Sequence, residues 1–97
     1  MPFVLKHKHT SEIYTCPLIN RYDIPYYGTK SWDELEEAAD TYVAFLTERG
    51  LADSTADWEP YELDEHKLKM CNVKLNNNAN KRIFLGANGT LETRMMS

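Results

Sequence analysis

The fold of this chain is constrained most by residues 31–50, whose sequence reads SWDELEEAADTYVAFLTERG. Ser31 and Glu34 have the spacing of a capping box, in which the hydroxyl accepts from the backbone N–H of Glu34 and the carboxylate accepts from the N–H of Ser31. Apolar side chains recur every three or four residues, which is the spacing of an amphipathic helix. Gly50 can adopt the left-handed conformation that ends many helices. The sequence therefore predicts a helix over residues 31–50.

The chain before this helix contains two segments of strand composition. Residues 3–8 alternate apolar with polar side chains, and residues 13–19 are rich in β-branched and aromatic types, with a polar turn between them. Together they predict a hairpin over residues 3–19. Pro17 cannot donate to a strand ladder, which places it at an edge, at a bulge or at the end of the regular pairing. Residues 20–30 combine turn residues with three tyrosines, and we interpret them as a tyrosine-rich loop.

The chain after the helix divides into an acidic segment and a set of strands. Residues 51–66 are polar, acidic and irregular in pattern. Residues 67–93 contain strand-like apolar segments separated by an asparagine-rich turn and a glycine-containing turn. The alternation in KLKMCNVKL changes phase near Cys71 and Asn72, and one extra residue in that strand would restore the register. The sequence therefore predicts C-terminal strands over residues 67–93 with a β-bulge at this point.

These elements predict a single α+β domain over residues 1–97, a length that allows one modest core. The expected order is β-β-α-β-β, with a last short strand where the C-terminal hairpin extends into a meander. The N-terminal hairpin and the C-terminal hairpin or meander form a small antiparallel sheet, and one amphipathic helix packs on one face of it. Because such a sheet has unpaired edges, a homodimer is a further expectation.

The charges of the chain are divided between its middle and its ends. Residues 31–66 contain twelve acidic residues and one basic residue, Arg49, whereas the rest of the chain contains ten basic and three acidic residues. One interpretation is that the carboxylates solvate a helix and its loop, while lysines protect strand edges from aggregation. The other is that an acidic face binds a basic partner, or that basic strands bind phosphate or an acidic partner.

The first functional hypothesis is a small non-enzymatic interaction protein, of an inhibitory or accessory kind, that binds another protein of basic character. Its acidic helix would imitate the charge of a nucleic acid, and tyrosines are enriched at interaction hot spots. The same rings could instead close the edge of the core, which is the more common role of aromatic residues in a small domain. The candidate partner-binding residues are Tyr22, Tyr26, Tyr27, Glu34, Glu36, Glu37 and Asp40.

The alternative hypothesis is a nucleic-acid-binding module with one basic sheet face. Lysines and one arginine recur in the predicted strands, and Tyr14 or Phe84 could stack on bases. An isoelectric point near 5.3 argues against this function, although binding depends on the local potential. The candidate nucleic-acid-binding residues are Lys6, Lys8, Lys67, Lys69, Lys74, Lys81 and Arg82.

An enzyme or a metal-binding protein is the third hypothesis. The chain contains no recognisable nucleophile motif and no phosphate-binding glycine loop. His7 and His9 point to the same face if their strand continues, and Cys16 could lie on the neighbouring strand. His66 is a more distant candidate, and no fourth ligand has a suitable spacing. We therefore predict no catalytic residues, no metal site and no cofactor.

The sequence also bears on the compartment. No apolar run approaches the roughly 20 residues of a membrane span, and the first residues lead into Lys6, His7 and Lys8 rather than into the apolar core of a signal peptide. Cys16 and Cys71 are far apart and lack the spacing of a structural zinc site or a disulfide framework. We expect a cytoplasmic protein without a membrane partner.

Overall fold

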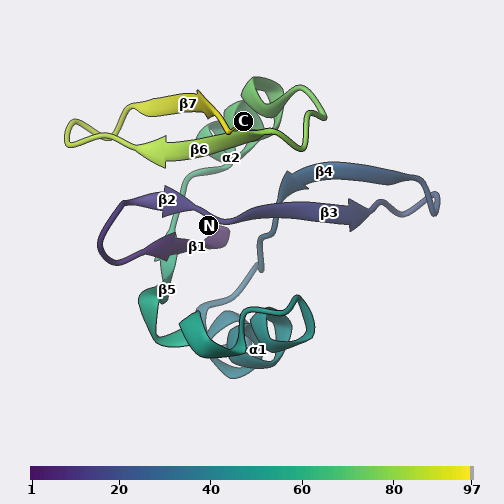
Figure 1. Ribbon diagram of the computed structural model, residues 1–97, viewed down its shortest axis with the longest axis vertical. Helices are drawn as coiled ribbons and strands as arrows, with labels where there is room; N and C mark the ends of the chain where they lie inside the picture. The colour runs from purple at the N-terminus through teal and green to yellow at the C-terminus, as the bar shows by residue number, and fades with distance from the viewer. Residues whose placement is uncertain (97) are drawn as a thin grey trace.

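A computed structural model describes residues 1–96 of the chain and shows two antiparallel sheets with helices packed against them (Figure 1). The strands are β1 (Phe3–His7), β2 (Glu12–Ile13), β3 (Thr15–Ile19), β4 (Pro25–Thr29), β5 (Trp58–Glu62), β6 (Lys81–Leu85) and β7 (Leu91–Met95). The helices are α1 (Leu35–Glu48), the short 3-10 helix η1 (Ala52–Asp57) and α2 (Glu65–Leu75). The radius of gyration is 12.7 Å, which is that of a compact domain of this length.

The larger sheet has five strands in the order β5-β1-β2-β6-β7, and the smaller sheet pairs β3 with β4. All of these pairs are antiparallel. Strand β1 lies inside the larger sheet, where Lys6 is opposite Ile13 of β2 and opposite Glu59 of β5. The predicted α+β class, with an antiparallel sheet and a helix against it, is therefore confirmed.

The core is divided into two apolar clusters by the larger sheet. Val4 and Leu5 are both fully buried neighbours in β1, and successive side chains of a strand point to opposite faces. Val4 belongs to the cluster that contains Cys71 and Leu75 of α2. Leu5 belongs to the cluster that contains Ala38 and Leu46 of α1. Each face of the sheet is therefore covered by its own helix, whereas the sequence pattern predicted only one helix.

The N-terminal hairpin forms only in part, because the chain changes sheets at Tyr14. Ile13 still pairs with β1, and the N–H of Tyr14 donates to the carbonyl of Leu5 over 2.9 Å. The following strand, β3, pairs instead with β4. The interpretation of residues 20–30 as a loop was therefore wrong for Pro25–Thr29, where the tyrosines favour a strand.

Helix α1 begins later than the sequence pattern predicted, and the capping box does not form. Phe3 and Trp32 exchange two backbone hydrogen bonds of 2.7 and 2.9 Å, and these hold the chain extended just before the helix. Glu34 is the N-cap residue and makes no side-chain capping bond. The end of the helix is as predicted, since Gly50 has a φ of +82° and its N–H donates to the carbonyl of Thr47.

The prediction of a strand and a β-bulge within residues 67–75 was wrong, because these residues belong to helix α2. Asp64 caps the helix, since its Oδ1 accepts from the backbone N–H of Lys67 over 2.7 Å. Cys71 and Leu75 are buried and Leu68 packs beside them, at a helical spacing of three and four residues. The apparent change of phase in the alternation was therefore the period of a helix.

The last two strands confirm the final part of the predicted meander, whereas the hairpin expected between residues 67–75 and 81–85 does not form, because residues 67–75 are helical. Strands β6 and β7 pair from Lys81 opposite Met95 to Leu85 opposite Leu91. The turn between them contains Gly89 with a φ of +78°, a conformation that glycine adopts at little cost. Strand β7 extends to Met95, two residues beyond the predicted end of the C-terminal strands.

Candidate partner-binding surface

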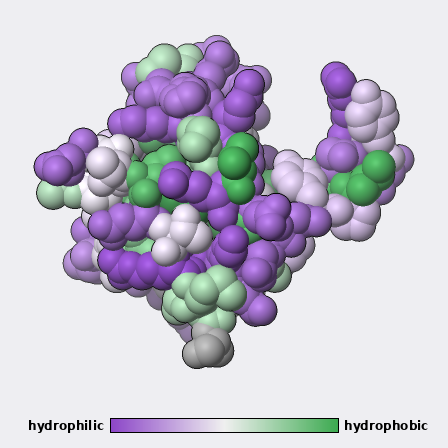
Figure 2. Space-filling model, turned by 90° about the horizontal axis from the view of Figure 1, so that it is seen from above, coloured by the Kyte–Doolittle hydropathy of each residue, from purple (hydrophilic) through white to green (hydrophobic). Residues whose placement is uncertain are grey.

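Strands β3 and β4 form a two-stranded ribbon whose turn projects from the body of the molecule (Figures 1 and 2). We call residues 15–29 the arm and residues 19–25 its tip. The tip is held by Asn20, whose Oδ1 accepts from the backbone N–H groups of Tyr22 and Ile24 over 2.8 and 3.1 Å. Asp23 completes the turn with a φ of +61°, which aspartate tolerates better than most residues. The turn therefore has a defined shape before any partner binds.

The tip exposes three large apolar or aromatic side chains. Ile19 is 70% exposed, Tyr22 is 68% exposed and Ile24 is 56% exposed. The guanidinium of Arg21 lies over the ring of Tyr22, 5.0 Å from the ring centroid. Figure 2 shows apolar side chains on this projecting part, away from the apolar residues of the body. The sequence pattern did not single out Ile19 or Ile24.

The arm separates the three candidate tyrosines. Tyr22 lies at the tip, Tyr26 is half-buried, and Tyr27 is buried in the core. The hydroxyl of Tyr27 accepts from Nη1 of Arg82 over 2.7 Å and lies 2.8 Å from Oγ1 of Thr15. Tyr27 therefore stabilises the interior, and only Tyr22 is fully available to a partner.

The candidate acidic residues lie on the outside of α1 and on its N-cap. Glu34, Glu36, Glu37 and Asp40 are all exposed. Within residues 1–96, none of them makes an ion pair. At the other end of the helix, Nη1 of Arg49 donates to the carbonyl of Pro17 over 2.7 Å. The acidic face is therefore a surface distinct from the tip, and the base of the arm is bonded to the residue that follows α1.

The seven candidate basic residues do not form one sheet face. Lys67, Lys69 and Lys74 lie on helix α2 rather than on a strand. Lys6 lies in β1, with its Nζ 5.2 Å from the ring centroid of Tyr61, and Lys8 follows that strand. Lys81 and Arg82 are neighbours in β6 and so point to opposite faces. The basic sheet face predicted for nucleic-acid binding required residues 67–75 to form a strand, and these residues form a helix.

The histidines near the N-terminus stabilise a turn. Nδ1 of His7 accepts from the backbone N–H groups of His9 and Thr10 over 3.1 and 3.2 Å. The rings of His7 and His9 lie 5.7 Å apart. Cys16 is buried, and burial raises the pKa of its thiol. In the part of the chain that the structure describes, no group of three or more histidine, cysteine or acidic side chains could hold a metal ion.

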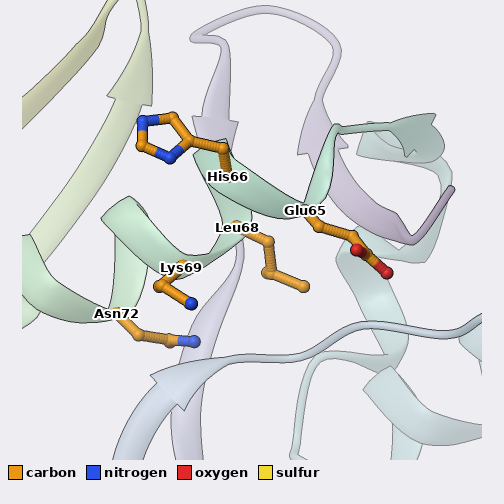
Figure 3. A pocket seen from close by; sticks show the side chains of 5 residues that line it. All are labelled: Glu65, His66, Leu68, Lys69 and Asn72. Atoms are coloured by element: carbon orange, nitrogen blue, oxygen red, sulfur yellow. The ribbon is translucent and has the colours of Figure 1, made fainter.

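A depression on the surface runs along α2 and has a volume of about 610 Å³ (Figure 3). In Figure 3, His66 extends to the other side of the helix ribbon from Lys69 and Asn72. The lining contains one acidic residue, Glu65, and one Lys, so it does not favour a ligand of either charge. Asn72 already accepts from the backbone N–H of Thr29 over 2.9 Å. This depression is therefore an open groove beside a structural contact.

A second depression, of about 360 Å³, lies where the two sheets meet. Burial raises the pKa of Tyr14 to about 12 and also raises the pKa of the Glu12 carboxyl, while Arg82 acts against the shift at Glu12. Nη1 of Arg82 is held by Tyr27 and by two backbone carbonyls. Arg82 of β6 therefore links the larger sheet to Tyr27 of the smaller one.

Comparison of the chain with models of protein families, with curated proteins and with solved structures finds no match. Among residues 1–96, no helix is both long enough and apolar enough to cross a membrane. The geometry of the surfaces described above therefore carries the functional argument.

Proposed function

We propose that this chain is a small non-enzymatic interaction protein that binds a partner protein through the tip of the arm. The observation that carries the proposal is the exposure of Ile19, Tyr22 and Ile24 on a ribbon whose turn projects from the body. Apolar side chains gathered on such an element, rather than scattered over the surface, are typical of an interaction site.

The shape of the tip supports the same function. Tyr22 supplies a large ring with few rotatable bonds, and such rings dominate the binding energy of many interfaces. The hydrogen bonds of Asn20 fix the turn in advance, so little conformational entropy is lost when a partner binds. The tip therefore offers a rigid apolar anchor of the kind that inserts into a pocket on another protein.

The acidic face of α1 suggests the electrostatic character of the partner. Glu34, Glu36, Glu37 and Asp40 are exposed and unpaired within residues 1–96. Exposed charges of one sign accelerate the encounter with a surface of opposite sign and contribute less to the final affinity. We therefore propose a partner with a basic surface, which the acidic face attracts and the tip anchors. An accessory or inhibitory protein would use its surface in this way.

Serine substitution of the tip is expected to reduce partner binding by about tenfold or more, since hot-spot side chains each carry a large share of the binding energy. The variant carries Ile19→Ser, Tyr22→Ser and Ile24→Ser. The measurement is quantitative affinity capture with tagged chain, followed by mass spectrometry of the proteins that wild type retains over an untagged control.

The matched control carries Val73→Ser, which removes an exposed apolar side chain from α2 instead of from the tip. We expect this control to retain the same partner as wild type. Equal recovery of every captured protein by the tip variant and by the control would contradict the proposal. Far-ultraviolet circular dichroism of both variants checks that each is folded.

A further inference from the structure

Three of the four edges of the two sheets are closed by specific side chains. In β5, Pro60 has no N–H to donate. The N–H of Leu63 donates to the carbonyl of Pro2, and the N–H of Lys8 donates to the carbonyl of Asp57, so residues 57 and 63 face β1. By alternation, the nitrogen of Pro60 faces away from β1, on the outer side of the strand. Proline at such a position prevents further pairing of an edge. The larger sheet is therefore closed at its β5 edge.

The smaller sheet is closed at both of its edges. On β4, the outward N–H groups of Tyr27 and Thr29 donate to Oδ1 of Asn77 and Asn72 over 2.7 and 2.9 Å. On β3, Pro17 lacks an N–H, and its carbonyl accepts from Arg49. On both edges, outward backbone groups are therefore missing or already bonded, which interrupts the ladder that another strand would need.

Among residues 1–96, no side chain closes the β7 edge in this way. The N–H of Leu85 donates to the carbonyl of Ser11, so the backbone groups of Leu85 face β2 rather than β7. Leu85 and the residue opposite it, Leu91, are therefore a pair without hydrogen bonds in the β6–β7 ladder. The N–H of Gly86 donates to Thr90, and the N–H of Met96 donates to Asn80. By alternation, the backbone groups of residues 91, 93 and 95 point away from β6. Since β7 is the last strand in the order, these groups form an open edge.

We propose that this edge pairs with the same edge of a second copy of the chain, antiparallel and with Thr93 opposite Thr93 of the partner copy. The sequence of β7, Leu-Glu-Thr-Arg-Met, is complementary to itself when reversed. In this register Glu92 lies opposite Arg94, and Leu91 lies opposite Met95, across the two-fold axis. The two larger sheets would then form one continuous sheet, and the interface would have the symmetry of common homodimers.

The backbone directions fit this register. Residues 91, 93 and 95 point outward, so their pairs are the ones that exchange hydrogen bonds across the axis. Glu92 and Arg94 then form pairs without hydrogen bonds, in which side chains approach most closely. Opposite charges directly across such a pair stabilise the ladder. The charges and the backbone groups therefore specify the same alignment.

The neighbouring registers are opposed by the same two residues. Moving the axis to Glu92 places the two Glu92 side chains opposite each other, and moving it to Arg94 does the same for arginine. Like charges directly opposite destabilise a strand pair. Arg94 also lies opposite Arg82 within the sheet, 4.1 Å above the ring of Phe84, and its own ion pair with Glu92 measures 3.3 Å. A second Glu92 from the partner copy would add a balancing charge beside these arginines.

The test measures molar mass by size-exclusion chromatography with light scattering over a range of concentrations. Wild type is expected to form a dimer whose fraction rises with concentration. Glu92→Arg and Arg94→Glu each place two pairs of like charges across the axis, and each is expected to raise the dissociation constant about tenfold or more. Both side chains are more than half exposed, so the fold itself is expected to tolerate either change.

Two further samples distinguish specific strand pairing from a general effect of net charge. An equimolar mixture of Glu92→Arg with Arg94→Glu restores opposite charges at every pair, so it is expected to form a heterodimer. The doubly substituted chain, Glu92→Arg with Arg94→Glu, is expected to form a homodimer again. A wild type that stays monomeric at every concentration, or a mixture that stays as monomeric as its two components, would overturn the proposal. Dimers of equal strength in every variant would also overturn it, because another surface would then be responsible.

Discussion

Replacement of Leu75 by alanine is expected to lower the free energy of unfolding by about 2 to 5 kcal/mol, the usual cost of truncating a fully buried leucine. Leu75 is completely buried between α2 and the larger sheet, among Val4, Ile13 and Ile83. The cavity left behind would be lined by rigid strand residues, which limits how far the site can collapse. Urea unfolding followed by circular dichroism measures the difference.

Val73→Ala is the control for this change, because Val73 lies two residues away and is 61% exposed. On α2 its replacement is expected to alter the free energy of unfolding by less than about 0.5 kcal/mol, since alanine favours a helix and little apolar area is lost. In a strand, residues 73 and 75 would share one face and both substitutions would be costly. Similar costs for the two variants would therefore contradict the helix.

Trp58→Ala is expected to cost about 3 to 5 kcal/mol of unfolding free energy, because it removes a buried indole from the other cluster. The ring of Trp58 packs edge-on against Tyr14 at 5.3 Å and against His7 at 5.0 Å. It also follows η1 directly, so its loss would loosen the connection between α1 and β5. The same urea titration, read by circular dichroism, provides the measurement.

Trp58→Phe is the matched variant for this position. A phenylalanine keeps an aromatic ring in the cluster and fills part of the indole volume, so we expect a smaller cost than that of alanine. A loss below about 1 kcal/mol for Trp58→Ala would contradict the assignment of Trp58 to a packed core. Equal costs for alanine and phenylalanine would contradict the edge-on packing of the ring.

The sequence predicted the class of fold because the strongest signals were local. Alternation in β1, the apolar spacing of α1 and the left-handed end at Gly50 each depend on residues within one element. The start of α1 was less predictable, since Trp32 is held by Phe3, which is far away in sequence. That tertiary pairing replaced the capping box, which is a local preference of modest size.

Helix α2 was missed because a short apolar run fits either secondary structure over its first few residues. Leu68 and Met70 are spaced as in a strand, whereas Leu68, Cys71 and Leu75 are spaced as in a helix. The structure packs Leu68, Cys71 and Leu75 together in the core, and Met70 is not part of that cluster. Asp64, just before this run, was the signal that could have identified a helix rather than a strand, since aspartate is a favoured N-cap residue. The same error produced the predicted basic sheet face.

The candidate surface was predicted in part. The sequence drew attention to Tyr22 and to the acidic face of α1, and both are exposed. It could not show that Tyr27 enters the core, because its partners Thr15 and Arg82 lie far from it along the chain. Nor could it show that Asn72 and Asn77 cap the edge of β4, since these bonds span 43 and 50 residues. Such contacts follow from tertiary structure and leave no local pattern.

Site-specific photo-crosslinking tests the role of the tip most directly. A photoreactive phenylalanine analogue replaces Tyr22 in one chain and Val73 in another, so that the tip is compared with an exposed position on α2. Binding through the tip predicts a discrete crosslinked protein from position 22 and a much weaker product, or none, from position 73. Discrete crosslinks from position 73 alone, or equal products from both positions, would contradict binding through the tip of the arm.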